Sequence, residues 1–118
     1  MYEYGASGTT ARAVDGDTLD LDIDLGFRLT SRQRVRLLGC NAPEHNAPGG
    51  TEATAFTTAW LASRPALIVH TVLDRGDKYG RLLARVIGSD GSDLTGALLA
   101  AGHAVGWDGH GRRPTVGV

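Results

Sequence analysis

Residues 15–25 read Asp-Gly-Asp-Thr-Leu-Asp-Leu-Asp-Ile-Asp-Leu, and they indicate which class of fold to expect. From Leu19 to Leu25, apolar and acidic side chains alternate. Successive side chains of a strand point to opposite faces, so this pattern predicts a strand with its apolar face in the core and its aspartates in water. Asp17 has the parity of the apolar set. A carboxylate that faces inward is costly unless a cation meets it.

Four other segments carry strand patterns, and turn residues separate them. We predict these strands over residues 9–14, 33–39, 67–73 and 82–87. The strand at 33–39 runs into a loop in which Pro43 ends regular pairing.

Two segments predict helices. Thr51 is a candidate N-cap for the first, which ends at the Arg-Pro pair of residues 64–65. Ser92 or Asp93 is expected to cap the second, and Gly102 lies where a left-handed residue ends a helix.

This order of elements indicates a mainly β protein with α-helices. Five short strands with a helix between the third and the fourth are typical of an OB-fold barrel, here with two packed helices. A length of 118 residues suits a single domain. We expect that domain to span residues 1–118, with its core at about 8–105 and a loop or tail at 106–118.

The composition excludes several classes of protein. No apolar run approaches the roughly 18 residues that a membrane span needs, so we expect no membrane association. The first residues carry no signal-peptide pattern, which favours the cytoplasm. A single cysteine, Cys40, excludes an intramolecular disulfide and a multi-cysteine zinc cluster, and nothing beside it indicates an activated thiolate. A net charge of -1 excludes a histone-like nucleic-acid binder but leaves room for a locally basic cleft.

The segment Asp15-Gly16-Asp17-Thr18 places two carboxylates beside a glycine at a strand junction. Asp-Gly is a common turn dipeptide, so a polar turn is one interpretation. The other is a site for a hard cation, because Ca²⁺ takes several oxygen ligands.

Residues 35–44 read VRLLGCNAPE and place Arg36 inside a mostly apolar strand. A guanidinium there needs an acidic partner, so we expect a buried or cleft-lining ion pair. Asn41 and Glu44 follow in the next loop, and both offer oxygen atoms. A structural ion pair and a functional site are both compatible with this segment.

Residues 77–81 read Asp-Lys-Tyr-Gly-Arg. A solvated loop with a surface arginine is one interpretation. The other is a phosphate-binding group, in which Lys78 supplies charge, Tyr79 a hydroxyl and Arg81 a bidentate fork.

Taken together, the three segments offer acids for a metal, a free carboxylate and two arginines. This set suits hydrolysis of a phosphodiester. A metal would polarise a phosphoryl oxygen, and Glu44 could accept a proton from the attacking water. Arg36 and Arg81 could neutralise the charge that develops on the phosphoryl oxygens.

The same segments resemble the staphylococcal-nuclease-like (thermonuclease) family. The matching stretches are VDGDTL at 14–19, VRLLGCNAPE at 35–44 and DKYGRLLA at 77–84, with a weaker match at 93–102. Three ordered motifs are far more specific than any one of them. The resemblance implies an OB-fold barrel and Ca²⁺-dependent cleavage of DNA and RNA, and we expect a monomer.

The resemblance also implies roles for individual residues. Arg36, Glu44 and Arg81 match the catalytic positions. Lys78 and Tyr79 match positions that contact a terminal phosphate of the bound nucleotide.

For the metal, Asp17 matches a direct calcium ligand, and the position of Ala42 supplies a backbone carbonyl. Asp15 matches an acid behind these ligands. Asn41 stands where the family has a calcium-binding aspartate, so one negative charge is lost. We therefore expect weaker Ca²⁺ binding, or tuning toward another divalent ion such as Mn²⁺.

Asn41 keeps a second interpretation open, namely a nuclease-like barrel that binds nucleic acid with little or no turnover. The presence of Arg36, Glu44 and Arg81 together favours the enzyme. At the end of the chain, Trp107 could stack on a base or cover the barrel core.

Overall fold

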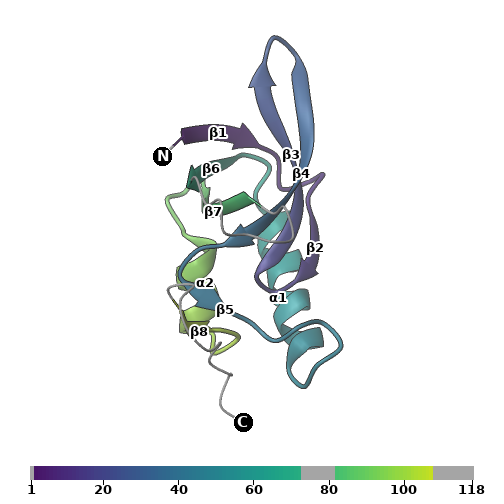
Figure 1. Cartoon of the computed structure of the whole chain (residues 1–118), viewed down its shortest axis with the longest axis vertical. Helices are drawn as coiled ribbons and strands as arrows, with labels where there is room; N and C mark the ends of the chain where they lie inside the picture. The colour runs from purple at the N-terminus through teal and green to yellow at the C-terminus, as the bar shows by residue number, and fades with distance from the viewer. Residues whose placement is uncertain (1, 73–81, 108–118) are drawn as a thin grey trace.

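The computed structural model describes residues 2–72 and 82–107, and they form a closed β-barrel with two helices (Figure 1). The barrel strands are β1 (Tyr2–Ala6), β2 (Arg12–Asp15), β3 (Thr18–Gly26), β4 (Leu29–Leu37), β6 (Leu67–Val72) and β7 (Leu82–Gly88). They follow the order β1-β6-β7-β4-β3-β2, and β1 also pairs with β3. Because β1 and β2 both lie along β3, they share one position of a five-stranded barrel. The predicted OB-type barrel is confirmed.

Pairing in the barrel is antiparallel apart from β4 and β7, which run parallel with Arg36 opposite Leu83. A helix and β6 separate β4 from β7 in the chain, which supplies the crossover that parallel strands need. This pairing holds β4, the strand of Arg36, between two neighbours.

The core follows the predicted alternation over most of β3. Leu19 and Leu21 are fully buried and Ile23 is 3% exposed, but Leu25 is 51% exposed, so its predicted core position is wrong. The reason lies in the β3–β4 hairpin, which extends past the barrel at the top of Figure 1. The other fully buried large apolar side chains of the core come from both strands and helices: Val35, Leu37, Leu61, Val69, Val86, Leu94 and Leu98.

Helix α1 (Gly50–Ala62) begins differently from the prediction. Its N-cap is Gly49, in the left-handed conformation with φ 81°, and no side chain caps it. The Thr51 hydroxyl instead donates to the carbonyl oxygen of His45 at 3.4 Å. The predicted N-cap role of Thr51 is therefore wrong, because the backbone of Gly49 makes the turn without a side-chain acceptor.

Helix α2 (Leu94–Ala100) has the predicted caps. The Asp93 carboxylate accepts a hydrogen bond from the Thr95 amide at 3.0 Å, and Gly102 is left-handed with φ 77°. No helix among residues 2–72 and 82–107 combines the length and apolar character of a membrane span.

Several strand boundaries differ from the predictions. No strand was predicted at β1, yet it pairs with β6 from Tyr2 opposite Thr71 to Ala6 opposite Leu67, so the sheet begins before residue 8. The predicted strand at 9–14 is β2 and begins at Arg12, and β4 begins at Leu29 rather than at residue 33. A short pair, β5 (Cys40–Asn41) and β8 (Val105–Gly106), was also not predicted.

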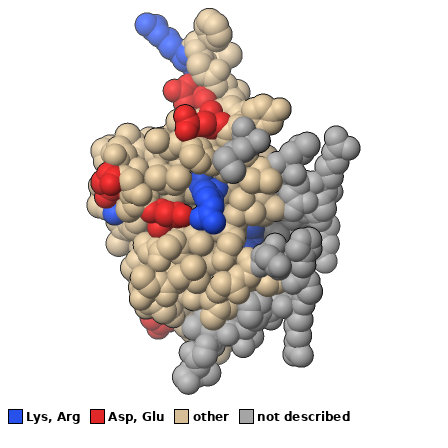
Figure 2. Space-filling view, turned by 90° about the vertical axis from the view of Figure 1, so that its left-hand side faces the viewer, with Lys and Arg blue, Asp and Glu red and all other residues tan. Residues whose placement is uncertain are grey.

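Several surface charges of the described residues are paired. Figure 2 shows basic side chains beside acidic ones at several points of one face. Arg34 and Asp20 lie 2.8 Å apart, Arg32 and Asp22 3.1 Å apart. These pairs connect facing positions of β3 and β4.

Candidate active site

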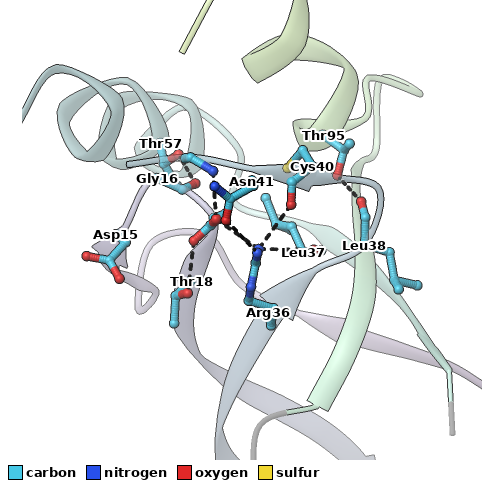
Figure 3. Close-up of polar contacts among 12 residues, drawn as sticks. Asp15, Gly16, Thr18, Arg36, Leu37, Leu38, Cys40, Asn41, Thr57 and Thr95 are labelled. Carbon is cyan, nitrogen blue, oxygen red and sulfur yellow. Dashed lines mark hydrogen bonds and ion pairs between the residues drawn. The ribbon is translucent and has the colours of Figure 1, made fainter. Parts of the chain in front are cut away.

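Asp17 and Arg36 form a buried ion pair at one end of the β3–β4 ladder (Figure 3). Arg36 Nη1 lies 2.9 Å from Asp17 Oδ2, and the two side chains are 5% and 6% exposed. The register of the strands sets this contact, because Arg36 is opposite Thr18, the residue after Asp17. Arg36 is thus the cation that the inward-facing carboxylate requires.

Two further donors complete the surroundings of the Asp17 carboxylate. The Ala42 amide donates to Oδ2 at 2.8 Å, and the Thr18 hydroxyl donates to Oδ1 at 3.1 Å. The Asp17 carbonyl oxygen accepts a hydrogen bond from the Leu37 amide at 2.9 Å. Asp17 is therefore fixed at both its side chain and its backbone.

The guanidinium of Arg36 is held by the turn that follows β4. It donates to the carbonyl oxygens of Leu37 at 3.4 Å and Cys40 at 3.2 Å, and to Asn41 Oδ1 at 3.1 Å. The indole ring of Trp107 lies 5.7 Å from the guanidinium carbon. Asn41 and Asp17 therefore both contact the Arg36 guanidinium.

Helix α2 anchors this turn from the opposite side. The Thr95 hydroxyl donates to the Leu38 carbonyl oxygen at 2.8 Å (Figure 3). Within the turn, Gly39 takes the left-handed conformation with φ 88°. The turn that binds Arg36 is therefore attached to the packed part of the molecule.

Asp15 connects the same region to the loop of Glu44. Asp15 Oδ1 accepts a hydrogen bond from the His45 amide at 2.8 Å and lies 3.1 Å from His45 Nδ1. The predicted position of Asp15 behind the metal ligands stays a prediction. Its observed partner is the residue that follows Glu44.

Glu44 is exposed to solvent, so its carboxylate is accessible to water. Its carbonyl oxygen accepts a hydrogen bond from the Ala47 amide at 2.9 Å, which closes a tight turn before α1. The same oxygen packs against Gly50, where a Cβ atom would overlap it. The absence of a side chain at Gly50 therefore allows this path of the Glu44 loop.

The available ligands suit a hard cation. Asp17 offers a carboxylate, Asn41 an amide oxygen and Ala42 a carbonyl oxygen, and oxygen donors are what Ca²⁺ prefers. The net negative charge of these ligands is low, because Arg36 already neutralises the Asp17 carboxylate. Among residues 2–72 and 82–107, no three His, Cys, Asp or Glu side chains form a metal-binding group.

Three predicted site residues, Lys78, Tyr79 and Arg81, lie outside the described residues. The others fall into two groups. Asp17, Arg36, Asn41 and Ala42 meet through direct contacts, whereas Asp15 and Glu44 belong to the adjoining loop.

Cys40 lies next to this centre but is not reactive. Its side chain is buried, and burial raises the pKa of its thiol to about 11, with the neighbouring Asp17 carboxylate adding to the effect. A thiol with this pKa is protonated at neutral pH. The prediction that Cys40 is not an activated thiolate is confirmed.

Thr57 is a site neighbour that the sequence analysis did not identify. Its hydroxyl donates to the Gly16 carbonyl oxygen at 2.6 Å, and it is fully buried in α1. A signal was available, because Ala53, Thr57 and Trp60 follow one another at core spacing in α1 and only Thr57 is polar. A buried hydroxyl needs a partner.

Known proteins with similar sequences are named as nucleases. A family model described as "Staphylococcal nuclease homologue" matches residues 34–114. Proteins named "Uncharacterized endonuclease" from Escherichia coli O157:H7 and from Escherichia coli are each 27% identical over 113 residues. The alignment with each covers 94% of this chain and 67% of the relative.

Proposed function

The chain belongs to the staphylococcal nuclease homologue family, and from this membership we propose that it is a Ca²⁺-dependent nuclease that hydrolyses phosphodiester bonds of DNA, RNA or both. The observation that carries the proposal is the buried Asp17–Arg36 pair, with Asn41 on the same guanidinium. In this group, the Arg36 guanidinium is a cation suited to phosphate, and the side-chain oxygens of Asp17 and Asn41 are ligands suited to a metal.

In the proposed mechanism, Arg36 donates hydrogen bonds to the non-bridging oxygens of the phosphodiester. Charge on these oxygens grows in the transition state, so donors that are already oriented lower the barrier. Contacts of Arg36 with Asp17, Leu37, Cys40 and Asn41 supply that orientation. Arg81 is proposed as the second donor.

Glu44 is proposed as the general base. Its exposed carboxylate can accept a proton from a water molecule that attacks phosphorus. The contacts of its loop with Gly50 and with Asp15, through His45, restrict where the carboxylate can reach.

Asp17, Asn41 and the Ala42 carbonyl oxygen are proposed to hold the metal, with Asp15 behind them. When bound, a divalent cation supplies positive charge that polarises a phosphoryl oxygen. With one amide in place of a carboxylate, the site is expected to bind Ca²⁺ weakly or to accept Mn²⁺.

Substrate contacts complete the proposal. Lys78 and Tyr79 are assigned to a terminal phosphate of the bound nucleic acid. The indole of Trp107, which lies close to Arg36, offers a flat surface on which a base can stack.

A second candidate function is a nucleic-acid-binding domain with little or no turnover. One observation favours it: the Asp17 charge is neutralised by Arg36, and Asn41 adds no charge of its own. A site with this charge could bind phosphate without holding a metal firmly.

The test is hydrolysis of denatured DNA by the purified protein with Ca²⁺ titrated to about tens of millimolar, and with EDTA as a blank. Glu44→Gln should abolish metal-dependent cleavage. Glu52→Gln is the matched control, since Glu52 is an exposed acid in the first turn of α1. Absence of cleavage with Ca²⁺, Mn²⁺ and Mg²⁺, together with retained DNA binding, would establish the second candidate instead.

A further inference from the structure

We propose that Thr57 of α1 is a positioning residue of the site, whose hydroxyl fixes the Asp15-Gly16-Asp17 segment from behind. This inference rests on the proposed nuclease function for its catalytic consequence. The contact itself is a hydrogen bond from Thr57 Oγ1 to the Gly16 carbonyl oxygen, 2.6 Å long and buried (Figure 3).

The partner of Thr57 is unusual for a threonine within a helix. The next residue, Thr58, donates its hydroxyl to the Thr54 carbonyl oxygen at 2.8 Å, one turn back in the same helix. That local bond is the common arrangement. Thr57 instead bonds a residue 41 positions earlier in the chain, so its hydroxyl connects α1 to the junction of β2 and β3.

Packing makes the junction close enough for this bond. A Cβ atom at Gly16 would lie 2.8 Å from the Ala53 side chain and 3.1 Å from the Ala42 side chain. Gly16 is therefore enclosed between α1 and the loop that follows β5. Ala42 is also the residue whose amide donates to the Asp17 carboxylate.

The bond acts directly on the orientation of Asp17. The Gly16 carbonyl belongs to the peptide unit that it shares with the Asp17 nitrogen, and a peptide unit is planar. A hydrogen bond to that carbonyl therefore fixes the plane from which Asp17 projects. On the other side of Asp17, its own carbonyl accepts the Leu37 amide. Thr57 and the Leu37 amide thus each constrain the backbone at Asp17.

Thr57 makes no contact with solvent, so it cannot itself bind substrate or metal. It acts through Asp17, the proposed ligand and the observed partner of Arg36. Removing groups that orient metal ligands typically lowers metal affinity about 10- to 100-fold. A purely structural role would lower stability without a selective effect on Asp17.

The test makes two comparisons at position 57, Thr against Val and Ser against Ala, and in each comparison only one of the two side chains carries a hydroxyl. Thr57→Val keeps the shape and removes the hydroxyl, and Thr58→Val is its control on the same helix. Thr57→Ser and Thr57→Ala both remove the methyl group, and only Ser keeps the hydroxyl. This second pair decides the result if the valine variant does not fold.

Two measurements are made on folded protein. The Ala42 amide donates a hydrogen bond to the Asp17 carboxylate. The rate of hydrogen exchange at this amide therefore reports how firmly that carboxylate is positioned when no metal is bound. Titration with Ca²⁺, followed by the shift in melting temperature, reports metal affinity. We expect Thr57→Val to speed Ala42 exchange about tenfold relative to amides of β6 and to weaken Ca²⁺ binding by a similar factor. Thr58→Val should change neither quantity. Thr57→Ser should show slower Ala42 exchange and tighter Ca²⁺ binding than Thr57→Ala.

Equal exchange and equal Ca²⁺ affinity in Thr57→Val and wild type, or in Ser and Ala, would overturn the proposal. Failure of the proposed function gives a different pattern. In that case the wild type neither cleaves DNA nor responds to Ca²⁺, while Ala42 exchange still shows whether Thr57 orients the segment.

Discussion

The Arg36 guanidinium lies 2.9 Å from the Asp17 carboxylate, and both side chains are almost completely removed from water. Each charge therefore depends on the other, because neither can be solvated in its absence. The same guanidinium is the proposed phosphate ligand, so one contact supports both the fold and the chemistry.

Breaking this pair should be costly. We expect Arg36→Met to lower the free energy of unfolding by about 3 kcal/mol, because it leaves a buried carboxylate without a cation. Adding Asp17→Asn to it should restore part of that loss. Urea unfolding measures both. Arg32→Met breaks the Arg32–Asp22 pair, which is 47% and 34% exposed, and should cost less than about 1 kcal/mol. Equal losses at the two pairs would contradict the dependence on burial.

Asn41→Asp should strengthen the metal site. The new carboxylate would face the position now shared by Asn41 and Arg36, and Ca²⁺ affinity rises with ligand charge. We expect at least about a tenfold gain in affinity by calorimetry, with a parallel gain in rate at low Ca²⁺. Asn46→Asp adds the same charge at an exposed position of the adjoining loop and serves as control. An unchanged affinity in Asn41→Asp would contradict an impaired metal site, and would mean either that the Asn41 amide is an adequate ligand or that Asn41 is not a ligand.

Gly50→Ala should impair catalysis and also lower the stability of the protein. A Cβ atom there would overlap the Glu44 carbonyl oxygen, so the loop of the proposed base must move. We expect kcat to fall at least about tenfold, since small displacements of catalytic groups are costly. Gly96→Ala in α2 would place its Cβ atom in ordinary van der Waals contact, 3.9 Å from Asp93 Cβ, and should add up to about 1 kcal/mol of stability with normal activity. Normal activity in Gly50→Ala would exclude a fixed path for this loop.

Acid should weaken the fold partly through Asp20. The hydrogen bond from Arg34 holds the pKa of Asp20 below its usual 3.8, against a smaller opposing effect of burial. The folded state therefore favours the charged form. This stabilisation is present above pH 3.8 and disappears as the pH falls through the lower native pKa. Asp20→Asn should remove that part of the acid dependence when unfolding is followed from pH 6 to about pH 2. An identical acid profile in the variant would show that Asp20 contributes nothing.

Alkali should weaken the fold through Cys40. Its native pKa of about 11 exceeds the ordinary value of 9.0, so the folded state favours the protonated thiol. The unfolded chain loses its proton first, and stability falls as the pH rises above 9.0. At pH 10 the loss in the free energy of unfolding should be about 1 kcal/mol. Cys40→Ala should lack this slope in urea unfolding from pH 8 to 10. A thiol that reacts rapidly with disulfide reagents in the native state would contradict the burial argument.

Elements that depend on residues close together in the chain were predictable from the sequence. Alternation in Leu19-Asp20-Leu21-Asp22-Ile23 determines β3, and the Asp93 carboxylate caps α2 as such a residue usually does. The inward parity of Asp17 also required a cation, and Arg36 supplies it. These features depend on neighbours in the chain or on a strong cost of burial.

Features that depend on distant partners were not predictable in the same way. β1 is a strand because β6 and β3 lie on either side of it, and its sequence Tyr-Glu-Tyr-Gly-Ala carries little pattern of its own. The N-cap of α1 is Gly49 rather than Thr51, and the left-handed backbone of Gly49 turns the chain there. The partner of Thr57 is 41 residues away, so spacing alone could mark its burial but not its acceptor.

Closure of the barrel also orders events during synthesis of the chain. Asp15, Asp17, Arg36, Glu44 and Thr57 all belong to the first 57 residues, yet β1 pairs with residues 67–72 and β4 with the strand at 82–88. A nascent chain can therefore carry these acids and Arg36 before the barrel that orients them exists. The proposed site is therefore complete only once residues 67–72 and 82–88 have been synthesised and have paired with β1 and β4.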